Sequence, residues 1–108
     1  MSAALTLDTT CRGDGTLVLI AVGEIDLSNI DAFSQALTDS TAKAAASGER
    51  LTVDLTAVEY LDSAAINALY HVADHIHLIV HPVLIRSLTI SGLAELVTIE
   101  SAATFDDR

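Results

Sequence analysis

Residues 51–69 have the sequence LTVDLTAVEYLDSAAINAL, in which a strand pattern is followed by a helix pattern. Apolar and polar residues alternate over 51–55, as in a strand with one buried face. From Ile66 onward, apolar residues recur at helical spacing along one stripe. Between the two patterns, Asp62 and Ser63 both stand where a helix needs an N-cap. The stretch therefore predicts a strand, a short turn and an amphipathic helix with a hydroxyl group at its start.

The sequence on either side supplies the other elements. The segment 13–15, Gly-Asp-Gly, predicts a hairpin turn, and the segment that follows, 16–22, is apolar on both faces and should lie centrally in a sheet. Gly92 followed by Leu93 predicts a helix end of the Schellman type, with Leu93 touching Leu88. In chain order we expect strands at 5–9 and 16–22, a helix between Ser28 and Gly48, a strand at 51–55, a helix from Asp62 or Ser63, a strand at 77–80, a helix from Pro82 to Gly92, and a strand at 96–99.

This order, strand-strand-helix-strand-helix-strand-helix-strand, predicts an α/β fold. We expect a mixed sheet of about five strands with the helices packed mainly against one face. A chain of 108 residues can form one hydrophobic core but not two, so residues 1–108 should form a single domain.

Composition argues against several classes of partner. Fifteen acidic and five basic residues give a net charge of −10, which repels nucleic acid and anionic lipid. The same charge suits a basic protein partner, or only keeps a hydrophobic chain in solution. Cys11 is the only cysteine, so no internal disulfide can form, and no leader pattern is present, which favours the cytoplasm. The apolar run 17–22 is far shorter than the roughly 20 residues that span a bilayer.

Motifs for nucleotide binding and for a nucleophile elbow are missing from the sequence, so we expect neither enzyme activity nor a cofactor. His71, His75, His77 and His81 lie close together in the chain, and the first two have the i, i+4 spacing of a metal-binding pair. However, no cluster of cysteines accompanies them, no carboxylate obviously completes a site, and a strand residue would not converge with a helix exterior. We interpret them as surface histidines that hold no metal.

Ser63 is well placed for a reversible charge switch. A helix N-terminus offers unpaired N–H groups and a partial positive charge, so a phosphate there would leave the helix intact. Phosphorylation would add about −1.5 to −2 charges beside Asp62 and repel a partner that fits the neutral form. Helix capping, worth about 1 kcal/mol, is a sufficient alternative reason for either residue. In the turn before the first helix, capping accounts for Ser28 or Asn29 but leaves Asp26 unexplained.

Three segments, 23–29 (GEIDLSN), 53–63 (VDLTAVEYLDS) and 88–93 (LTISGL), resemble the STAS domain, and specifically bacterial anti-sigma factor antagonists. The resemblance extends in order over nearly the whole chain. It implies that Ser63 is phosphorylated by an anti-sigma factor that is also a serine kinase. It also implies that the unphosphorylated protein binds this kinase and frees a sigma factor. Such a protein is a non-enzymatic regulator of transcription that acts by partner switching, as in stress responses.

The family's binding surface includes the turn after the second strand and the start of the second helix. By resemblance, these positions are Asp26, Ser28, Asp62, Ser63, Ala64 and Asn67. Two departures from the family pattern carry further expectations. Ala65 replaces the usual glycine two residues after the serine, which should alter how closely the kinase approaches. The interval from Ser63 to Pro82 is shorter than usual, so the second helix or the fourth strand should be truncated.

A second function fits the same resemblance. The chain could be a STAS docking subunit of a transport or signalling assembly, with Ser63 serving only as a cap or contact. Under either hypothesis we expect a monomer or weak dimer, with no direct insertion into the membrane.

Overall fold

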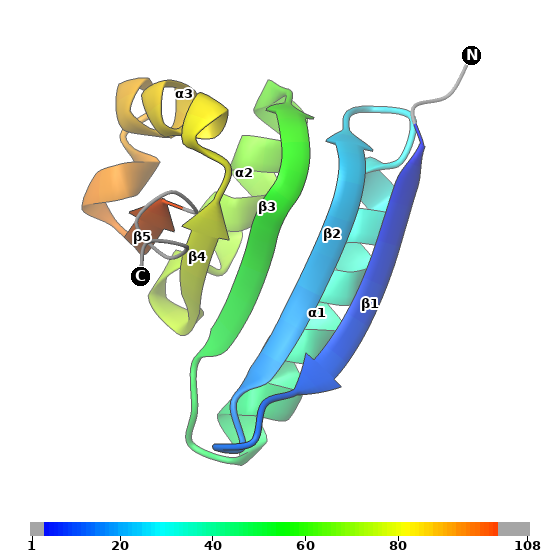
Figure 1. The fold of residues 1–108 in the computed structure, drawn as a ribbon, viewed down its shortest axis with the longest axis vertical. Helices are drawn as coiled ribbons and strands as arrows, with labels where there is room; N and C mark the ends of the chain where they lie inside the picture. Colours follow the sequence, from blue (N-terminus) through cyan, green and yellow to red (C-terminus); the bar gives the residue numbers. More distant parts are fainter. Residues whose placement is uncertain (1–3, 102–108) are drawn as a thin grey trace.

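The computed structural model describes residues 4–101, which form an α/β fold around one five-stranded sheet (Figure 1). The spatial order of the strands follows their order in the chain. The first pair is antiparallel and the other pairs are parallel, which confirms the predicted mixed sheet. The strands are β1 (Leu5–Cys11), β2 (Leu17–Ile25), β3 (Leu51–Leu61), β4 (Ile76–Val80) and β5 (Thr98–Ser101).

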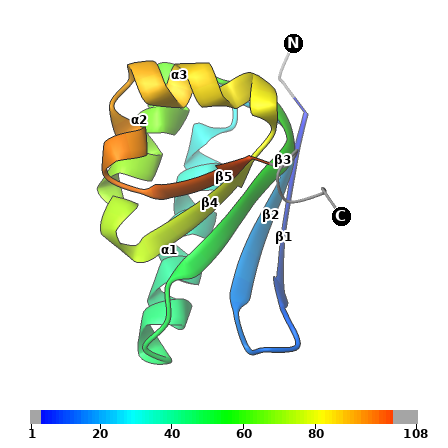
Figure 2. The same ribbon diagram turned by 60° about the vertical axis from the view of Figure 1, so that its left-hand side comes forward.

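Helices α1 (Ile30–Ala46) and α2 (Ser63–His71) pack against one face of the sheet, as predicted (Figures 1 and 2). Helix α3 (Ile85–Ile90) lies at the end of the sheet towards which β2, β3 and β4 point. No helix of residues 4–101 covers the opposite face, which we call the open face. Single 3₁₀ turns complete the chain at η1 (Ala73–His75), η2 (Pro82–Leu84) and η3 (Leu93–Glu95).

The core lies between the helices and the sheet. Phe33 and Leu37 of α1, Leu69 of α2 and Leu88 of α3 are all fully buried there. Helical spacing puts the two α1 residues on one stripe, so burying them fixes which side of α1 faces the sheet. Their partners on the strands are equally buried and include Leu19, Ala21, Leu51, Val53, Leu55, Ile76, Leu78 and Val80.

The buried stripe of α2 differs slightly from the predicted one. The predicted stripe consists of Ile66, Leu69, Tyr70 and Ala73. In the structure Ala65 and Leu69 are completely buried, whereas Ile66 and Tyr70 are half-buried at the edge of the core. A small residue such as Ala65 lets the helix approach the sheet closely, and Ile66 and Tyr70, which are spaced i, i+4, lie together on one flank of the buried stripe. The helix has nine residues and the next strand, β4, has five. Their truncation relative to other family members stays a prediction.

Strands β2 and β3 are longer than predicted. β3 continues to Leu61 rather than ending near Leu55, because bulges interrupt the alternation that the prediction used. One extra β3 residue lies between the pairs Ile20–Asp54 and Val22–Ala57, and another lies between Gly23–Val58 and Glu24–Tyr60. Each extra residue changes which side chains face inward. Bulges therefore allow one continuous strand to carry an irregular apolar pattern.

The chain after Val80 departs from prediction in two places. The segment from Pro82 begins as a 3₁₀ turn, and the α-helix starts only at Ile85. The last strand is Thr98–Ser101 rather than 96–99, because the N–H groups of Leu96 and Val97 donate to the Leu93 carbonyl within a turn. Those backbone groups cannot join the sheet at the same time, so β5 starts two residues later.

The end of α3 is a variant of the predicted Schellman motif. Gly92 has a positive φ of 86°, and its N–H donates to the Thr89 carbonyl at 3.1 Å. The Ser91 hydroxyl donates to the Leu88 carbonyl (2.8 Å) and accepts from the Leu93 N–H (3.3 Å), so it bridges two groups that the standard motif joins directly. The Tyr70 hydroxyl donates to the Ser91 carbonyl and ties α2 to this helix end.

Gly23 is required where β1 approaches β2. Its φ is +121°, a conformation that residues with a side chain rarely adopt. The next N–H, that of Glu24, donates to the Ala4 carbonyl at 3.1 Å. A Cβ atom on Gly23 would lie 2.1 Å from the Ala4 oxygen, which is too close for any side chain. This contact holds the start of β1 against the end of β2.

We expect Gly23→Ala to lower the free energy of unfolding by about 3 kcal/mol, because strain at positive φ adds to a backbone clash. Gly48→Ala is the matched control. Gly48 also has a positive φ, of 74°, but open space surrounds its Cβ position, so the loss should be about 1 kcal/mol. Urea denaturation of the three proteins measures both values. Equal losses would contradict the clash at Gly23.

We expect Thr41→Val to raise the free energy of unfolding by about 1 kcal/mol. The Thr41 hydroxyl is buried in α1 and has no hydrogen-bond partner in the part of the chain that the structure describes. Valine keeps the shape and removes the unpaired group. As a control, Thr41→Ser keeps the hydroxyl and loses a buried methyl group, so it should lower stability. Thermal or urea unfolding decides, and a less stable valine variant would show that the hydroxyl has a partner.

Candidate protein-binding site

The predicted site residues meet where β2 and β3 end. Ile25 pairs with Leu61 at the last step of this parallel ladder, and the Asp62 N–H donates to the Ile25 carbonyl at 3.2 Å. Parallel strands end at the same edge of a sheet, so the residues that follow them are neighbours. Asp26 and Asp62 are those residues. The pairing thus brings together segments that are 36 positions apart in sequence.

The loop 26–29 is held by its own side chains. Asp26 Oδ1 accepts from the Ser28 N–H (2.8 Å) and from the Ser28 hydroxyl (2.5 Å). Asn29 Oδ1 accepts from the Asp26 N–H (3.0 Å), and Asn29 Nδ2 donates to the Glu24 carbonyl (2.9 Å). These bonds brace the loop between β2 and α1.

The loop geometry corrects the expectation that Ser28 or Asn29 caps α1 with its side chain. Asn29 occupies the N-cap position, but its side chain makes no cap bond to the helix. Short polar side chains can bond backbone groups nearby instead of capping, and they do so here. Asp26, which capping left unexplained, is an acceptor in this loop network.

Asp62, rather than Ser63, caps α2. Its Oδ1 accepts from the Ala65 N–H at 3.0 Å, and its carbonyl accepts from the Ile66 N–H at 3.1 Å. Ser63 is the first residue of the helix and is exposed. Its hydroxyl makes no hydrogen bond to any residue between 4 and 101. The capping role therefore belongs to the aspartate and leaves the serine hydroxyl open to reaction.

The remaining predicted residues surround Ser63. Asn67 is exposed four residues further along α2, hence on the same side of the helix as Ser63, and Ala64 is half-buried on the flank of this row. Ala65, by contrast, is completely buried. The methyl group that replaces the family's glycine lies in the core, so it does not extend the surface that a kinase would approach. This burial argues against the expectation that Ala65 alters how closely a kinase approaches Ser63.

The histidines do not form a metal site in the described residues. Nowhere in residues 4–101 do three or more His, Cys, Asp or Glu side chains gather closely enough to hold a metal ion. His77 Nε2 lies 3.2 Å from Glu100 Oε2 across β4 and β5, and His81 Nδ1 accepts from the Val83 N–H at 3.0 Å. His71 and His75 are exposed. Two of the four thus have structural contacts.

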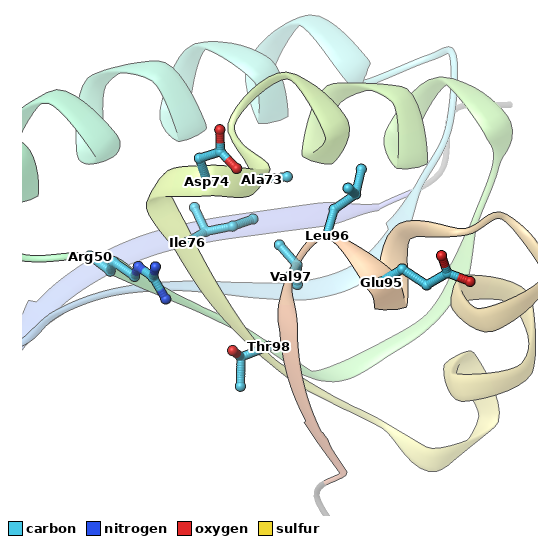
Figure 3. Close-up of a pocket in the computed structure, with 8 residues that line it drawn as sticks. All are labelled: Arg50, Ala73, Asp74, Ile76, Glu95, Leu96, Val97 and Thr98. Atoms are coloured by element: carbon cyan, nitrogen blue, oxygen red, sulfur yellow. The ribbon is translucent and has the colours of Figure 1, made fainter.

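The hollow in Figure 3 is at the other end of the sheet. It has a volume of about 260 Å³ and lies where β4 and β5 begin. Arg50 and Asp74 are on one side of it and Glu95 is on the other (Figure 3). No predicted site residue lines it. The convergent site around Ser63 is instead a surface made from one loop and one helix start, which is the form of a protein-binding site rather than a small-molecule pocket.

The fold places the chain among α/β domains with a mixed sheet covered mainly on one face. A family model for the STAS domain matches residues 9–106, so the chain belongs to the STAS domain family. Proteins of this family and fold act as binding domains and not as enzymes. No helix within residues 4–101 has the length and hydrophobicity needed to cross a membrane.

Several solved structures are similar to this chain. An anti-sigma factor antagonist from Mycobacterium paratuberculosis is 26% identical with a TM-score of 0.76, over 90% of this chain and 86% of that one. The anti-sigma factor antagonist SpoIIAA in its unphosphorylated form shares the fold at 17% identity and a TM-score of 0.58, over 97% and 95% of the two chains. A protein from Shewanella loihica with a SpoIIAA-like fold has 14% identity and a TM-score of 0.56, over 99% and 89%. Among curated proteins, a sequence comparison finds no match.

We expect Asp62→Ala to lower the free energy of unfolding by about 1 kcal/mol and Ser63→Ala to change it by less than about 0.5 kcal/mol. The reason is that only the aspartate side chain bonds an N–H group of the first turn of α2. Chemical denaturation of both variants beside the unmodified protein tests the assignment. If Ser63→Ala lowers the free energy of unfolding more than Asp62→Ala does, the serine and not the aspartate caps α2.

Proposed function

We propose that this protein is an anti-sigma factor antagonist whose docking surface centres on Ser63. In its unphosphorylated form it binds an anti-sigma factor serine kinase in the cytoplasm and frees a sigma factor for transcription. The observation that carries the proposal is the exposed Ser63 hydroxyl, which no cap bond occupies, at the start of a helix beside a braced loop. The likeness in sequence and fold to a mycobacterial anti-sigma factor antagonist supports it.

The proposed docking surface consists of the residues that converge at the ends of β2 and β3. Ser63 and Asn67 present exposed polar groups on one side of α2, and the small side chain of half-buried Ala64 beside them leaves room for a close approach. The loop 26–29 after β2, which its own hydrogen bonds hold, lies next to the start of this helix and extends the surface. A partner would thus contact Asp26, Ser28, Asp62, Ser63, Ala64 and Asn67 together.

Phosphorylation would change this surface without unfolding it. The hydroxyl takes no part in capping, so adding a phosphate costs no cap bond. The phosphate would stand at the positive end of the α2 dipole, which stabilises negative charge. The surface would nevertheless gain about −1.5 to −2 charges beside the Asp62 carboxylate. A partner that fits the neutral hydroxyl would meet repulsion and the desolvation of a dianion, so it would dissociate while the fold persists.

The first test is to isolate the protein from its own cells with phosphatases blocked, and to map phosphate on the peptide that contains Ser63. We expect a phosphorylated fraction that is missing from a Ser63→Ala strain. If no phosphate appears during growth or stress, and the protein instead purifies stably with a transport or signalling assembly, the docking-subunit hypothesis replaces this one.

We expect Ser63→Asp to weaken binding to a purified anti-sigma factor kinase from the same organism by at least about tenfold. Stability should change by less than about 0.5 kcal/mol, since an acidic residue suits the first turn of a helix. Thr10→Asp adds the same charge on the exposed strand β1, near its far end, and serves as the control. Isothermal titration calorimetry measures the affinities. Equal weakening by both variants would argue against a role for Ser63 in docking.

A further inference from the structure

Leu27 is an exposed apolar side chain in a loop that internal hydrogen bonds hold. Its side chain is 76% exposed, although leucine is usually buried. The residues on either side of it are fixed by the hydrogen bonds from Ser28 to Asp26. The exposure is therefore a property of the braced loop and not of a loose chain segment. Leu27 stands next to Asp26 and Ser28 of the proposed docking surface, but it is not among the site residues predicted from the sequence.

Two more apolar side chains are exposed at the same end of the sheet, on the open face. Val22 is 45% exposed and Tyr60 is 49% exposed. Tyr60 pairs with Glu24, and Val22 is on β2 two residues before Glu24, so both lie at the end of the ladder that leads to Leu27. Exposed apolar residues scattered singly need no explanation, whereas a group at one corner of a sheet marks an interaction surface. We call Val22, Leu27 and Tyr60 the apolar corner.

Acidic groups lie at the same end of the sheet as this corner. Carboxylates at the same end of the sheet come from the last residues of β2 and β3, the two loops that follow, and the first turn of α1: Glu24, Glu59, Asp26, Asp62 and Asp31. Arg12, Lys43 and Arg50 lie at the opposite end, in the β1–β2 hairpin, the last turn of α1 and the residue before β3. Among residues 4–101, Arg86 of α3 is the one Lys or Arg at the Ser63 end.

We propose that the partner's docking surface is basic and contains an apolar pocket that receives Leu27, with the rest of the apolar corner contacting the rim of that pocket. This inference rests on the proposed function and names the chemistry of the partner. The acidic groups at this end of the sheet would attract the partner's basic surface and speed association. Burial of Leu27 would then slow dissociation, as a side chain that fills a desolvated pocket does.

The test compares Leu27→Ser with Leu96→Ser. Leu96 is 52% exposed in the hollow of Figure 3, so the control removes a similar apolar side chain at the opposite end of the sheet. Binding to the purified anti-sigma factor kinase is measured by surface plasmon resonance. We expect Leu27→Ser to weaken affinity by about ten- to thirtyfold, mainly through faster dissociation, and Leu96→Ser to leave it unchanged.

The charge part is tested with two double variants that change net charge equally. Glu24→Gln with Glu59→Gln removes charge beside the apolar corner, and Glu49→Gln with Glu95→Gln removes it at the other end. We expect only the first pair to slow association severalfold and to reduce its dependence on salt. If both pairs slow association equally, the acidic groups beside the apolar corner do not steer the partner, and this part of the proposal is wrong.

The outcomes separate the inference from the proposed function. If the kinase binds the unmodified protein and Ser63→Asp weakens that binding but Leu27→Ser does not, the inference is wrong and the proposed function stands. If no anti-sigma factor kinase binds, both fail. Light scattering tests whether a second copy of this chain occupies the apolar corner instead. A dimer that Leu27→Ser dissociates would show that it does, and would overturn the proposal.

Discussion

The parallel pairing of β2 with β3 is the constraint on which the rest of the structure depends. It is the most extensive contact between two elements of the fold, and it runs from Val18 to Ile25 despite two bulges. Its last bond, from the Asp62 N–H to the Ile25 carbonyl, sets the position of the residue that caps α2. The same pairing brings the loop 26–29 beside that cap. The geometry of the surface is thus a direct result of strand register.

Much of this fold follows from short-range patterns in the sequence. The alternation at 51–55 and the helical spacing of Phe33 and Leu37 gave the right elements, because one face of each is fully buried. The patterns failed where hydrogen bonding overrides them. Bulges shift the inward positions of β3, and the turn at Leu93 uses N–H groups that a strand would need. Such competition between backbone partners is decided by tertiary contacts that a local pattern does not contain.

The structure brings the candidate residues together at one end of the sheet, and their binding of a partner stays a prediction; their separate structural roles could not be predicted from the sequence. Asp62 and Ser63 are equally good capping residues in sequence, and only the direction of the aspartate side chain towards the Ala65 N–H separates them. Asp26 resisted explanation because its partner is a neighbour in the loop rather than a helix end. The exposure of Leu27 could not be predicted from the sequence, because it depends on how the loop is braced. A leucine between two polar turn residues was the one available signal.

The length of α2 has a consequence for when Ser63 can be recognised. Nine residues are fewer than the roughly 12–15 that an isolated helix needs in water, so α2 exists only while Ala65 and Leu69 are packed in the core. The capped, exposed presentation of Ser63 is therefore a feature of the folded chain alone. An enzyme that requires this geometry would therefore modify folded copies of the protein and not unfolded ones, whether newly made or damaged. A modified Ser63 would then mark a correctly folded chain.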